Sequence, residues 1–454
     1  MPRTRDMTKG APVRLLLWFS LPILLGNLLQ QLYSLIDTLI IGRLLGVTAL
    51  TAVTASGWLD WAMLSVPLGL SQGFSIHAAQ CFGAGDLKGL KRAVAQSYLI
   101  AAAAAALLMA LSLSVLHPVL VMMNSPEETI AMTESYLRIL YAGIPVVMAL
   151  NTFSGFLYAL GNSRVPLIAL ACSSFVNIGL DWVFVGPLGW GTDGGAYATV
   201  IAQGVSALIC MTAVLRIPEL RPSRPDYRPD PGRIGKLTWL GSPIVLQNLI
   251  ISLGGLVLQG VVNAYGFIFM AGYNAAARLQ GLIETAGTAL GSAQATFTGQ
   301  NYGAGKMDRV RGGLKKAVLL SLASAVFIGL VMVLFGRPIL TLFVHDEAAV
   351  VDQVLSIGYD FLLVMSAGLP TLYLLFVYRS TLQGLGETLI PMMSGGVELV
   401  MRVGGALLLP KILGLTGVYL AEIMAWAGAG FFLMIFCYRR LRKLQIAFVS
   451  SHRG

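Results

Sequence analysis

The sequence predicts an all-α integral membrane protein with twelve transmembrane helices in two six-helix lobes. Of its 454 residues, 56% are hydrophobic and only 11% are charged, whereas soluble domains carry about 25% charged residues. Apolar runs of about 20 residues, the length that spans a bilayer, recur between Gly, Pro and charged residues. We expect helices at 14–41, 52–77, 93–116, 132–160, 166–185, 195–215, 237–263, 271–297, 317–335, 351–382, 391–409 and 417–437.

The Lys and Arg residues predict how these helices are oriented. An even number of spans puts both ends of the chain on the same side of the membrane. That side carries 24 of the 31 Lys and Arg residues, and the opposite side carries only Arg43, Arg337 and Lys411. By the positive-inside rule, both termini, including the basic C-terminal tail, are cytoplasmic. The net charge of +10 therefore reflects topology, and we expect no nucleic-acid partner.

The two halves of the chain share a series of landmarks, which predicts an internal repeat. Five short motifs (PIxxxN, GAG, AGxP, LG and GxY) begin at 22, 83, 142, 160 and 195 and recur in the same order at 243, 303, 367, 385 and 417. Because each repeat holds six helices, both enter the membrane the same way round, and a pseudo-twofold axis along the membrane normal should relate them. We predict an N-terminal lobe over 1–216, a Pro- and Arg-rich cytoplasmic linker over 217–236 and a C-terminal lobe over 237–454.

Two aspartates lie inside predicted membrane spans. Asp37 and Asp181 each have a polar partner four residues earlier, Tyr33 and Asn177, which places both members of a pair on one helix face. A carboxylate at bilayer depth costs roughly 2.5–3.5 kcal/mol, so such residues predict an ion or proton site. The alternative is a buried polar pair that only fixes helix packing.

Several stretches together resemble the multidrug and toxic compound extrusion (MATE) transporters over essentially the whole chain. They are LYSLIDTLIIGRLLG (32–46), CFGAGDLKGLKR (81–92), ALGNSRVP (159–166), NIGLDWVFV (177–185) with GTDGGAYAT (191–199), and GQNYGAGKMDRVRGG (299–313). The resemblance implies export of amphiphilic, often cationic drugs or toxic compounds in exchange for inward H⁺ or Na⁺, by alternating access.

Within that family the chain is most similar to the DinF-like branch, whose cation site lies in the N-terminal lobe. The resemblance assigns that site to Tyr33, Asp37, Asn177, Asp181 and Thr199. It also implies that the first helix bends near Pro22, since proline removes a backbone hydrogen bond. The alternative is that Pro22 forms only a static kink. NorM-type members use an acidic residue on the seventh helix, but the span at 237–263 has no carboxylate. We therefore expect the C-terminal lobe to be cavity wall rather than a second ion site.

The predicted site suits either coupling ion. Na⁺ prefers oxygen ligands, which Asp37, Asn177, Asp181 and Thr199 offer. Alternatively, two nearby carboxylates cannot both ionise cheaply, and the pair would share a proton. We expect no cofactor and no metal other than this Na⁺, since the four Cys and four His residues are scattered.

Other polar residues in the spans have weaker indications. Glu284, Gln259 and Met63 are candidates for substrate contact, with helix packing as the alternative for Met63. Glu398 and Arg402 are four residues apart, which predicts an intrahelical ion pair. For Asp60, Asp360 and Glu422 the pattern does not specify a depth in the membrane, and exposure to water is the alternative to a functional role.

The sequence leaves one main rival to the multidrug antiporter, which is a lipid-linked oligosaccharide flippase of the same superfamily. That activity would favour a cationic cavity and often extra helices. A membrane-embedded enzyme is not expected, because the chain lacks clustered carboxylates of the DxxxD kind. We expect a monomer in the plasma (inner) membrane.

Overall fold

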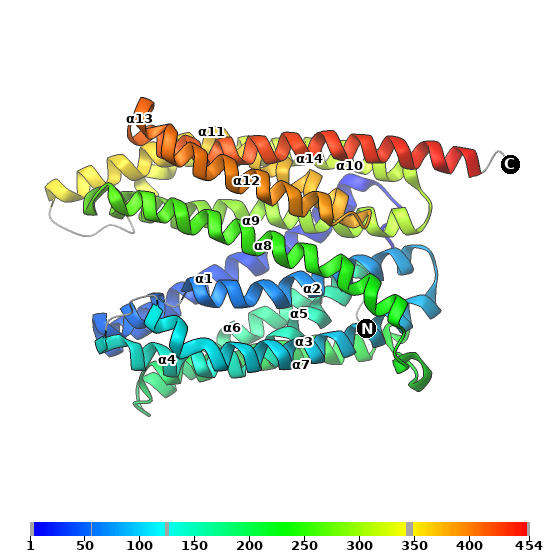
Figure 1. Ribbon diagram of the computed structural model, residues 1–454, viewed down its shortest axis with the longest axis horizontal. Helices are drawn as coiled ribbons and strands as arrows, with labels where there is room; N and C mark the ends of the chain where they lie inside the picture. The colour runs from blue at the N-terminus through cyan, green and yellow to red at the C-terminus, as the bar shows by residue number, and fades with distance from the viewer. Residues whose placement is uncertain (1–3, 56, 123–126, 342–347, 452–454) are drawn as a thin grey trace. The chain divides into compact units, whose positions relative to one another are not determined.

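In the computed structural model, the described residues are 4–55, 57–122, 127–341 and 348–451, and among them there is no β-strand (Figure 1). Eight of the described helices are long and apolar enough to cross a membrane, or nine if a bent pair counts as one span. The predicted all-α membrane fold class is therefore confirmed.

Every predicted span corresponds to at least one helix. Most helices extend several residues past the predicted bounds, because they continue beyond their apolar stretch. The helices are α1 (Pro12–Ala55), α2 (Gly57–Gly83), α3 (Leu87–Met122), α4 (Glu127–Ala142), α5 (Ile144–Ala159), α6 (Arg164–Val185), α7 (Gly191–Leu215), α8 (Pro231–Ala264), α9 (Phe267–Gly303), α10 (Met307–Leu340), α11 (Ala348–Gly384), α12 (Leu389–Leu408), α13 (Pro410–Leu413) and α14 (Leu415–Ser451).

The fourth predicted span, 132–160, is not one continuous helix. It is divided into α4 and α5, which are bent by 45° at Gly143. Pro145 stands at the start of α5, where its missing N–H does no harm. A Cβ on Gly143 would lie 2.7 Å from Cγ2 of Val200 on α7, so glycine is needed for close packing at the bend.

The contacts divide the chain into two compact units, which we call unit 1 and unit 2. Unit 1 comprises Met1–Asp6 and Leu21–Val245, and unit 2 comprises Met7–Ser20 and Leu246–Gly454. Two of the boundaries between the units fall within helices. One lies beside Pro22 of α1, and the other lies shortly after Pro243 of α8. Each of these repeat-related helices thus begins in one unit and continues in the other. The lobes at 1–216 and 237–454, which follow the sequence repeat, stay a prediction.

Unit 1 is held together partly by close helix packing at glycines. α5 packs against α2, α3 and α7, and α6 packs against α7. The first part of α8 crosses α2 so closely that a Cβ on Gly73 would lie 2.6 Å from Cα of Gly241. Small residues allow such backbone approach in membrane proteins, where packing replaces the hydrophobic effect as the driving force.

Unit 2 is built around α11, which packs against α9, α10 and α14, while α12 packs against α14 (Figure 1). Four aromatic rings form its interior cluster. Phe269 stacks on Tyr419 at 5.9 Å between ring centroids, and Phe361 contacts Tyr273 at 4.8 Å and Tyr419 at 5.4 Å, both edge-on.

The internal repeat appears in the turns as well as in the sequence. Gly85 and Gly305, 220 residues apart, both have a left-handed φ, of +68° and +70°. In each turn the residue after the glycine donates its backbone N–H to the carbonyl five residues earlier, Asp86 to Cys81 and Lys306 to Asn301. Gly161 and Gly386 form a second matching pair of turns. The two halves therefore share backbone geometry as well as residue types.

The predicted linker 217–236 is anchored rather than free. Its two short 3₁₀ turns are Pro218–Leu220 and Arg224–Tyr227. The side-chain amide of Gln96 on α3 donates to the carbonyls of Asp226 and Arg228, each at 2.9 Å. Hydrogen bonds from Ser223 hold the pKa of the partly buried Asp226 carboxyl below its usual range.

The turn at Gly161 leads to a testable expectation. Its φ of +77° strains any other residue, and a Cβ there would collide with the carbonyl oxygen of Arg5, whose N–H donates to the carbonyl of Leu160 at 2.9 Å. We expect Gly161→Ala to lower the free energy of unfolding by about 2 kcal/mol or more, because the left-handed backbone alone costs roughly 1–2 kcal/mol.

Thermal unfolding in detergent, followed through the thiols of the buried Cys81 and Cys210, measures this effect. Gly85→Ala is the matched control, since Gly85 also has a left-handed φ but nothing within 4 Å of the added Cβ. Equal losses for the two variants would show that the Arg5 contact contributes nothing.

Candidate functional site

The two intramembrane aspartates meet where α1, α6 and α7 converge in unit 1. Asp181 and Asn177 lie one turn apart on α6 and are almost fully buried, at 0% and 2% exposure. Asp37 on α1 is partly buried. Oδ1 of Asp37 and Oδ1 of Asp181 each lie 3.9 Å from the point that a Cβ on Gly195 of α7 would occupy. The absence of a side chain at Gly195 thus leaves room for both carboxyl groups.

These side chains carry five buried polar atoms that have no hydrogen-bond partner among the described residues. They are Oδ1 of Asp37, both carboxylate oxygens of Asp181, and both Oδ1 and Nδ2 of Asn177. Buried polar atoms are normally paired, and an unpaired one costs about 1–3 kcal/mol. Four of the five are oxygens, which are the ligands that Na⁺ or a shared proton requires. The donor set therefore fits a cation or proton.

A cavity of about 200 Å³ with a mixed polar and apolar lining adjoins this group. Tyr33, Asn177 and Thr199 all line it, so unit 1 brings the five residues assigned by resemblance into one region. The other polar side chains that line it are Gln30, Asn151, Ser173, Ser174 and Gln203, and its apolar wall includes Trp61, Leu64 and Leu68. The cavity thus presents many hydrogen-bonding groups beside an aromatic and aliphatic wall.

Sequence reasoning left two side chains of this region without a role in the site. Tyr136 on α4 is 7% exposed and lies within electrostatic range of Asp37, Asp60 and Asp181. Asp60 on α2 is close enough to affect Tyr33 as well. An acid inside an apolar run was a signal for Asp60. Nothing in the sequence marks Tyr136, because its proximity depends on how α4 packs.

The candidate substrate contacts do not gather in one unit. Met63 lies on α2 in unit 1, packs against the apolar core there, and is not among the residues that line the 200 Å³ cavity. Gln259 and Glu284 belong to unit 2. Nε2 of Gln259 donates to Oδ1 of Asn263 at 2.8 Å, and Nε2 of Gln280 donates to Oε1 of Glu284 at 2.8 Å.

Pro22 is buried within α1, and the helix stays regular across it. The non-helical residue of α1 is Gly46, with φ of 84° and ψ of −174°. The boundary between the two units lies between Ser20 and Leu21 of α1, so a bend near Pro22 would fall beside this boundary.

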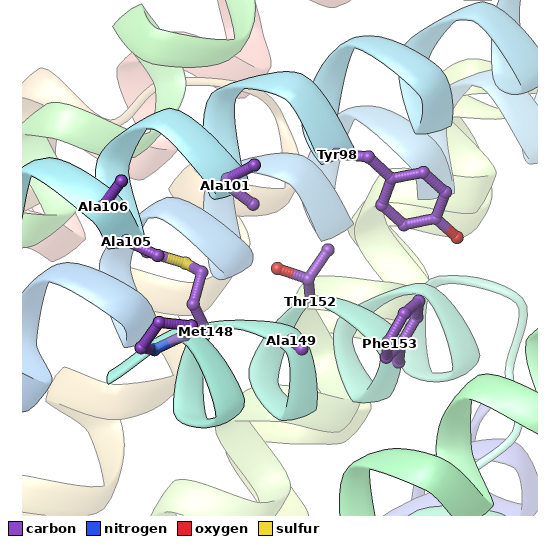
Figure 2. Close-up of a pocket in the computed structure, with 10 residues that line it drawn as sticks. Tyr98, Ala101, Ala105, Ala106, Met148, Ala149, Thr152 and Phe153 are labelled. Carbon is purple, nitrogen blue, oxygen red and sulfur yellow. The ribbon is translucent and has the colours of Figure 1, made fainter. Parts of the chain in front are cut away.

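A second, apolar cavity of about 370 Å³ lies between α3 and α5 in unit 1 (Figure 2). Its α3 wall consists of alanines, and Tyr98 and Phe153 close one end, with ring centroids 5.7 Å apart. Thr152 is bound to Ser71, with 3.2 Å between the two hydroxyl oxygens. This cavity offers little polar chemistry. In the described part of the chain, no three His, Cys, Asp or Glu side chains are grouped to hold a metal ion.

An all-α membrane protein made of two repeats, with an acidic, oxygen-rich site inside one of them, has the construction of a secondary transporter. The chain belongs to the MatE family, whose model matches residues 22–183 and 243–408. The two matches begin at the paired landmarks Pro22 and Pro243, which confirms the internal repeat. Members of this family are transporters, so the chain is not an enzyme.

The similarity to known proteins extends over nearly the whole chain. The probable multidrug resistance protein YpnP of Bacillus subtilis (strain 168) is 29% identical over 387 residues, which are 85% of each chain. A crystal structure of MATE in complex with MaL6 has a TM-score of 0.92 at 23% identity and covers 98% of this chain and 100% of that chain. A structure of MATE in the bent conformation has a TM-score of 0.90 at 22% identity, with the same coverage. The predicted two-lobed, twelve-helix fold is confirmed.

Proposed function

We propose that this protein is a secondary antiporter that exports amphiphilic, often cationic drugs or toxic compounds in exchange for inward H⁺ or Na⁺. The observation that carries the proposal is the set of five buried, unpartnered polar atoms on Asp37, Asn177 and Asp181. Such a group deep in a helix bundle is stabilised only when a cation or proton neutralises and ligates it. The similarity to a probable multidrug resistance protein supports the class of substrate.

In the proposed cycle the cation and the drug favour different conformations of unit 1. Asp37 and Asp181 bind the ion, Asn177 and Thr199 add oxygen ligands, and Tyr33 lines the same cavity as Asn177 and Thr199. A ligand shifts a conformational equilibrium only by its differential affinity for the two states. Binding of the ion to Asp37 and Asp181 therefore expels the drug only if the drug site is narrower in the ion-bound conformation than in the drug-bound one.

Bending of α1 near Pro22 is the proposed movement. A MATE structure described as bent aligns with 98% of this chain, and Pro22 cannot supply the backbone N–H that would stiffen the helix there. We place the protein in the plasma (inner) membrane as a monomer of the DinF-like branch, with both termini cytoplasmic. Glu284, Gln259 and Met63 are proposed substrate contacts.

Proteoliposomes loaded with ethidium and given an imposed pH or Na⁺ gradient test the proposal. We expect gradient-driven transport by the wild type and a loss on the order of tenfold or more in Asp37→Asn, since even the loss of a group that only supports the ion ligands typically costs about 10–100-fold. The gradient that drives transport identifies the coupling ion.

Asp352→Asn is the matched control, since it makes the same change at a side chain that is 76% exposed. Wild-type transport by Asp37→Asn at normal expression would overturn the ion-site assignment. Movement of a lipid-linked oligosaccharide, without ethidium transport, would instead identify a flippase.

A further inference from the structure

The apolar cavity between α3 and α5 opens at the surface of unit 1. We call it the alanine groove, because its α3 wall consists of Ala101, Ala102, Ala105 and Ala106 (Figure 2). Ala102 and Ala106 on this wall, and Pro145 on the α5 side, are exposed. Only 22% of the most apolar stretch of α3 is buried in the protein. The exposed side chains of a membrane span contact lipid, so hydrocarbon can enter the groove from the bilayer.

The shape and the lining of the alanine groove suit a hydrocarbon chain. Its four α3 alanines form two rows along one helix face, because members of a row are four residues apart. From Tyr98 to Ala106 the lining extends about 12 Å along α3, at a rise of about 1.5 Å per residue. No charged side chain occurs among the described residues that line the groove, and the Thr152 hydroxyl is already hydrogen-bonded to that of Ser71. The groove is therefore an elongated apolar slot of about 370 Å³.

The Tyr98 end of the groove lies beside the linker. Tyr98 is two residues after Gln96, whose side-chain amide donates to the carbonyls of Asp226 and Arg228. The phenol of Tyr98 also lies within electrostatic range of the phenol of Tyr227. The 3₁₀ turn that contains Tyr227 packs against α3. One end of the apolar slot thus meets the polar linker.

This end of the groove carries an excess of positive charge. The basic side chains within 86–92 and 224–233 are Lys88, Lys91, Arg92, Arg224, Arg228 and Arg233. The acidic side chains within the same ranges are Asp86, Asp226 and Asp230. Arg233 pairs with Asp230 at 3.2 Å and also donates to the carbonyl of Gly89 on α3, while Nε of Arg92 lies 3.8 Å from Oδ1 of Asp226. Six basic side chains against three acidic ones leave an excess of three positive charges.

We propose that the alanine groove binds an acyl chain of an anionic phospholipid, whose phosphate headgroup pairs with the basic side chains at the Tyr98 end. The apolar slot accepts the chain, and the excess positive charge selects the headgroup. A zwitterionic lipid would leave that charge unmatched, and an organic cation would be repelled by it. The groove shares no lining residue with the cavity beside Asp37 and Asp181, so this lipid site goes beyond the proposed exchange of ion and drug.

Native mass spectrometry of the purified protein in detergent tests this site. The probes are phosphatidylglycerol and phosphatidylcholine with identical dioleoyl chains, so that only the headgroup differs. We expect the wild type to bind phosphatidylglycerol about tenfold more tightly than phosphatidylcholine, because several basic residues attract the anionic headgroup. Inorganic phosphate, which has the charge but no chain, should not displace the lipid.

Filling the groove should remove the site for the chain. Ala102→Trp places an indole in the slot and should weaken the binding of both lipids about tenfold, because the displaced chain loses its apolar contacts. Ala103→Trp is the matched control, since Ala103 is also exposed on α3 but does not line the groove. It should bind both lipids as the wild type does.

Removing charge should affect the headgroup alone. Lys91→Gln combined with Arg92→Gln should weaken phosphatidylglycerol binding about 30-fold, since each basic residue beside an anionic headgroup contributes roughly fivefold. Phosphatidylcholine binding should stay unchanged. Both side chains are at least partly exposed, so this double variant keeps the fold even if Ala102→Trp does not. Lys315→Gln combined with Lys316→Gln removes the same charge from exposed side chains of α10 and should match the wild type.

Equal binding of the two lipids by the wild type, or wild-type binding by the double variant, would overturn the proposal. Displacement of the lipid by inorganic phosphate would do the same, because it would indicate an anion site without a chain. If Ala102→Trp instead lost the binding of tetraphenylphosphonium, the groove would belong to a cationic substrate and not to a lipid. None of these results concerns gradient-driven transport and its loss in Asp37→Asn, on which the proposed function depends.

Discussion

Arg402→Met is expected to destabilise unit 2 by about 3–5 kcal/mol, the usual effect of removing one partner from a buried ion network. Arg402 is the sole bridge from Glu398 to Glu422 among the described residues, and its side chain is only 6% exposed. Its loss leaves Glu422 buried without a counter-charge, whereas Glu398 keeps Arg379. Methionine fills a similar volume, so the loss of stability should come from the missing charge rather than from a cavity.

Thermal unfolding followed at the buried thiol of Cys437, in α14 of unit 2, measures this loss. Arg337→Met is the control, because its pair with Asp352 is exposed at 54% and 76%, and such pairs contribute about 0–1 kcal/mol. Adding Glu422→Gln to Arg402→Met should recover part of the stability. If Arg402→Met were as stable as Arg337→Met, the network would have no structural role.

Gly73→Val should destabilise unit 1 by about 3 kcal/mol, the upper end for overpacking. The added Cβ would lie 2.6 Å from both the Cα and the backbone N of Gly241. A flexible side chain could move aside, but here the obstacle is the α8 backbone, so α2 and α8 must separate. That movement would also disturb the neighbouring contact, where Gly69 faces Val245 in the same way.

The thiol of Cys81 on α2 reports this separation, and we expect it to react at a lower temperature in Gly73→Val than in the wild type. Gly179→Val is the matched control in unit 1, since a Cβ at Gly179 would meet nothing within 4 Å. Both substitutions place valine in a helix, so both carry the same cost in helix propensity. If Gly73→Val and Gly179→Val lowered the temperature at which Cys81 reacts by the same amount, the α2–α8 contact would be able to relax around the larger side chain.

Much of the fold was predictable because a bilayer leaves few choices for the backbone. Its polar groups must be satisfied within the segment, so every long apolar run becomes a helix. The exception, 132–160, shows the limit of that rule. The run was long and apolar enough for one helix, yet Gly143 and Pro145 divide it, and the need for glycine comes from Val200 on a distant helix.

The polar residues that meet inside the protein were predictable to a different degree in unit 1 and in unit 2. Asp37 and Asp181 stood out because an ionisable residue in an apolar run is rare, and the helical period paired each with a polar neighbour. Tyr136 gave no such signal. In unit 2 the spacing of Glu398 and Arg402 indicated their pair, but the partners Arg379 and Glu422 come from α11 and α14, beyond the reach of helical periodicity.

The sequence by itself therefore determined the all-α membrane class, the twelve spans and the repeat, because each depends on apolar length or on spacing along the chain. Only the tertiary structure decided which polar groups meet. It placed Asp37 and Asp181 beside the same glycine with unpartnered oxygens, and it matched Arg402 with carboxylates from two helices. The physical reason is that electrostatic and hydrogen-bond energies depend on distances between helices, which no periodicity within one helix specifies.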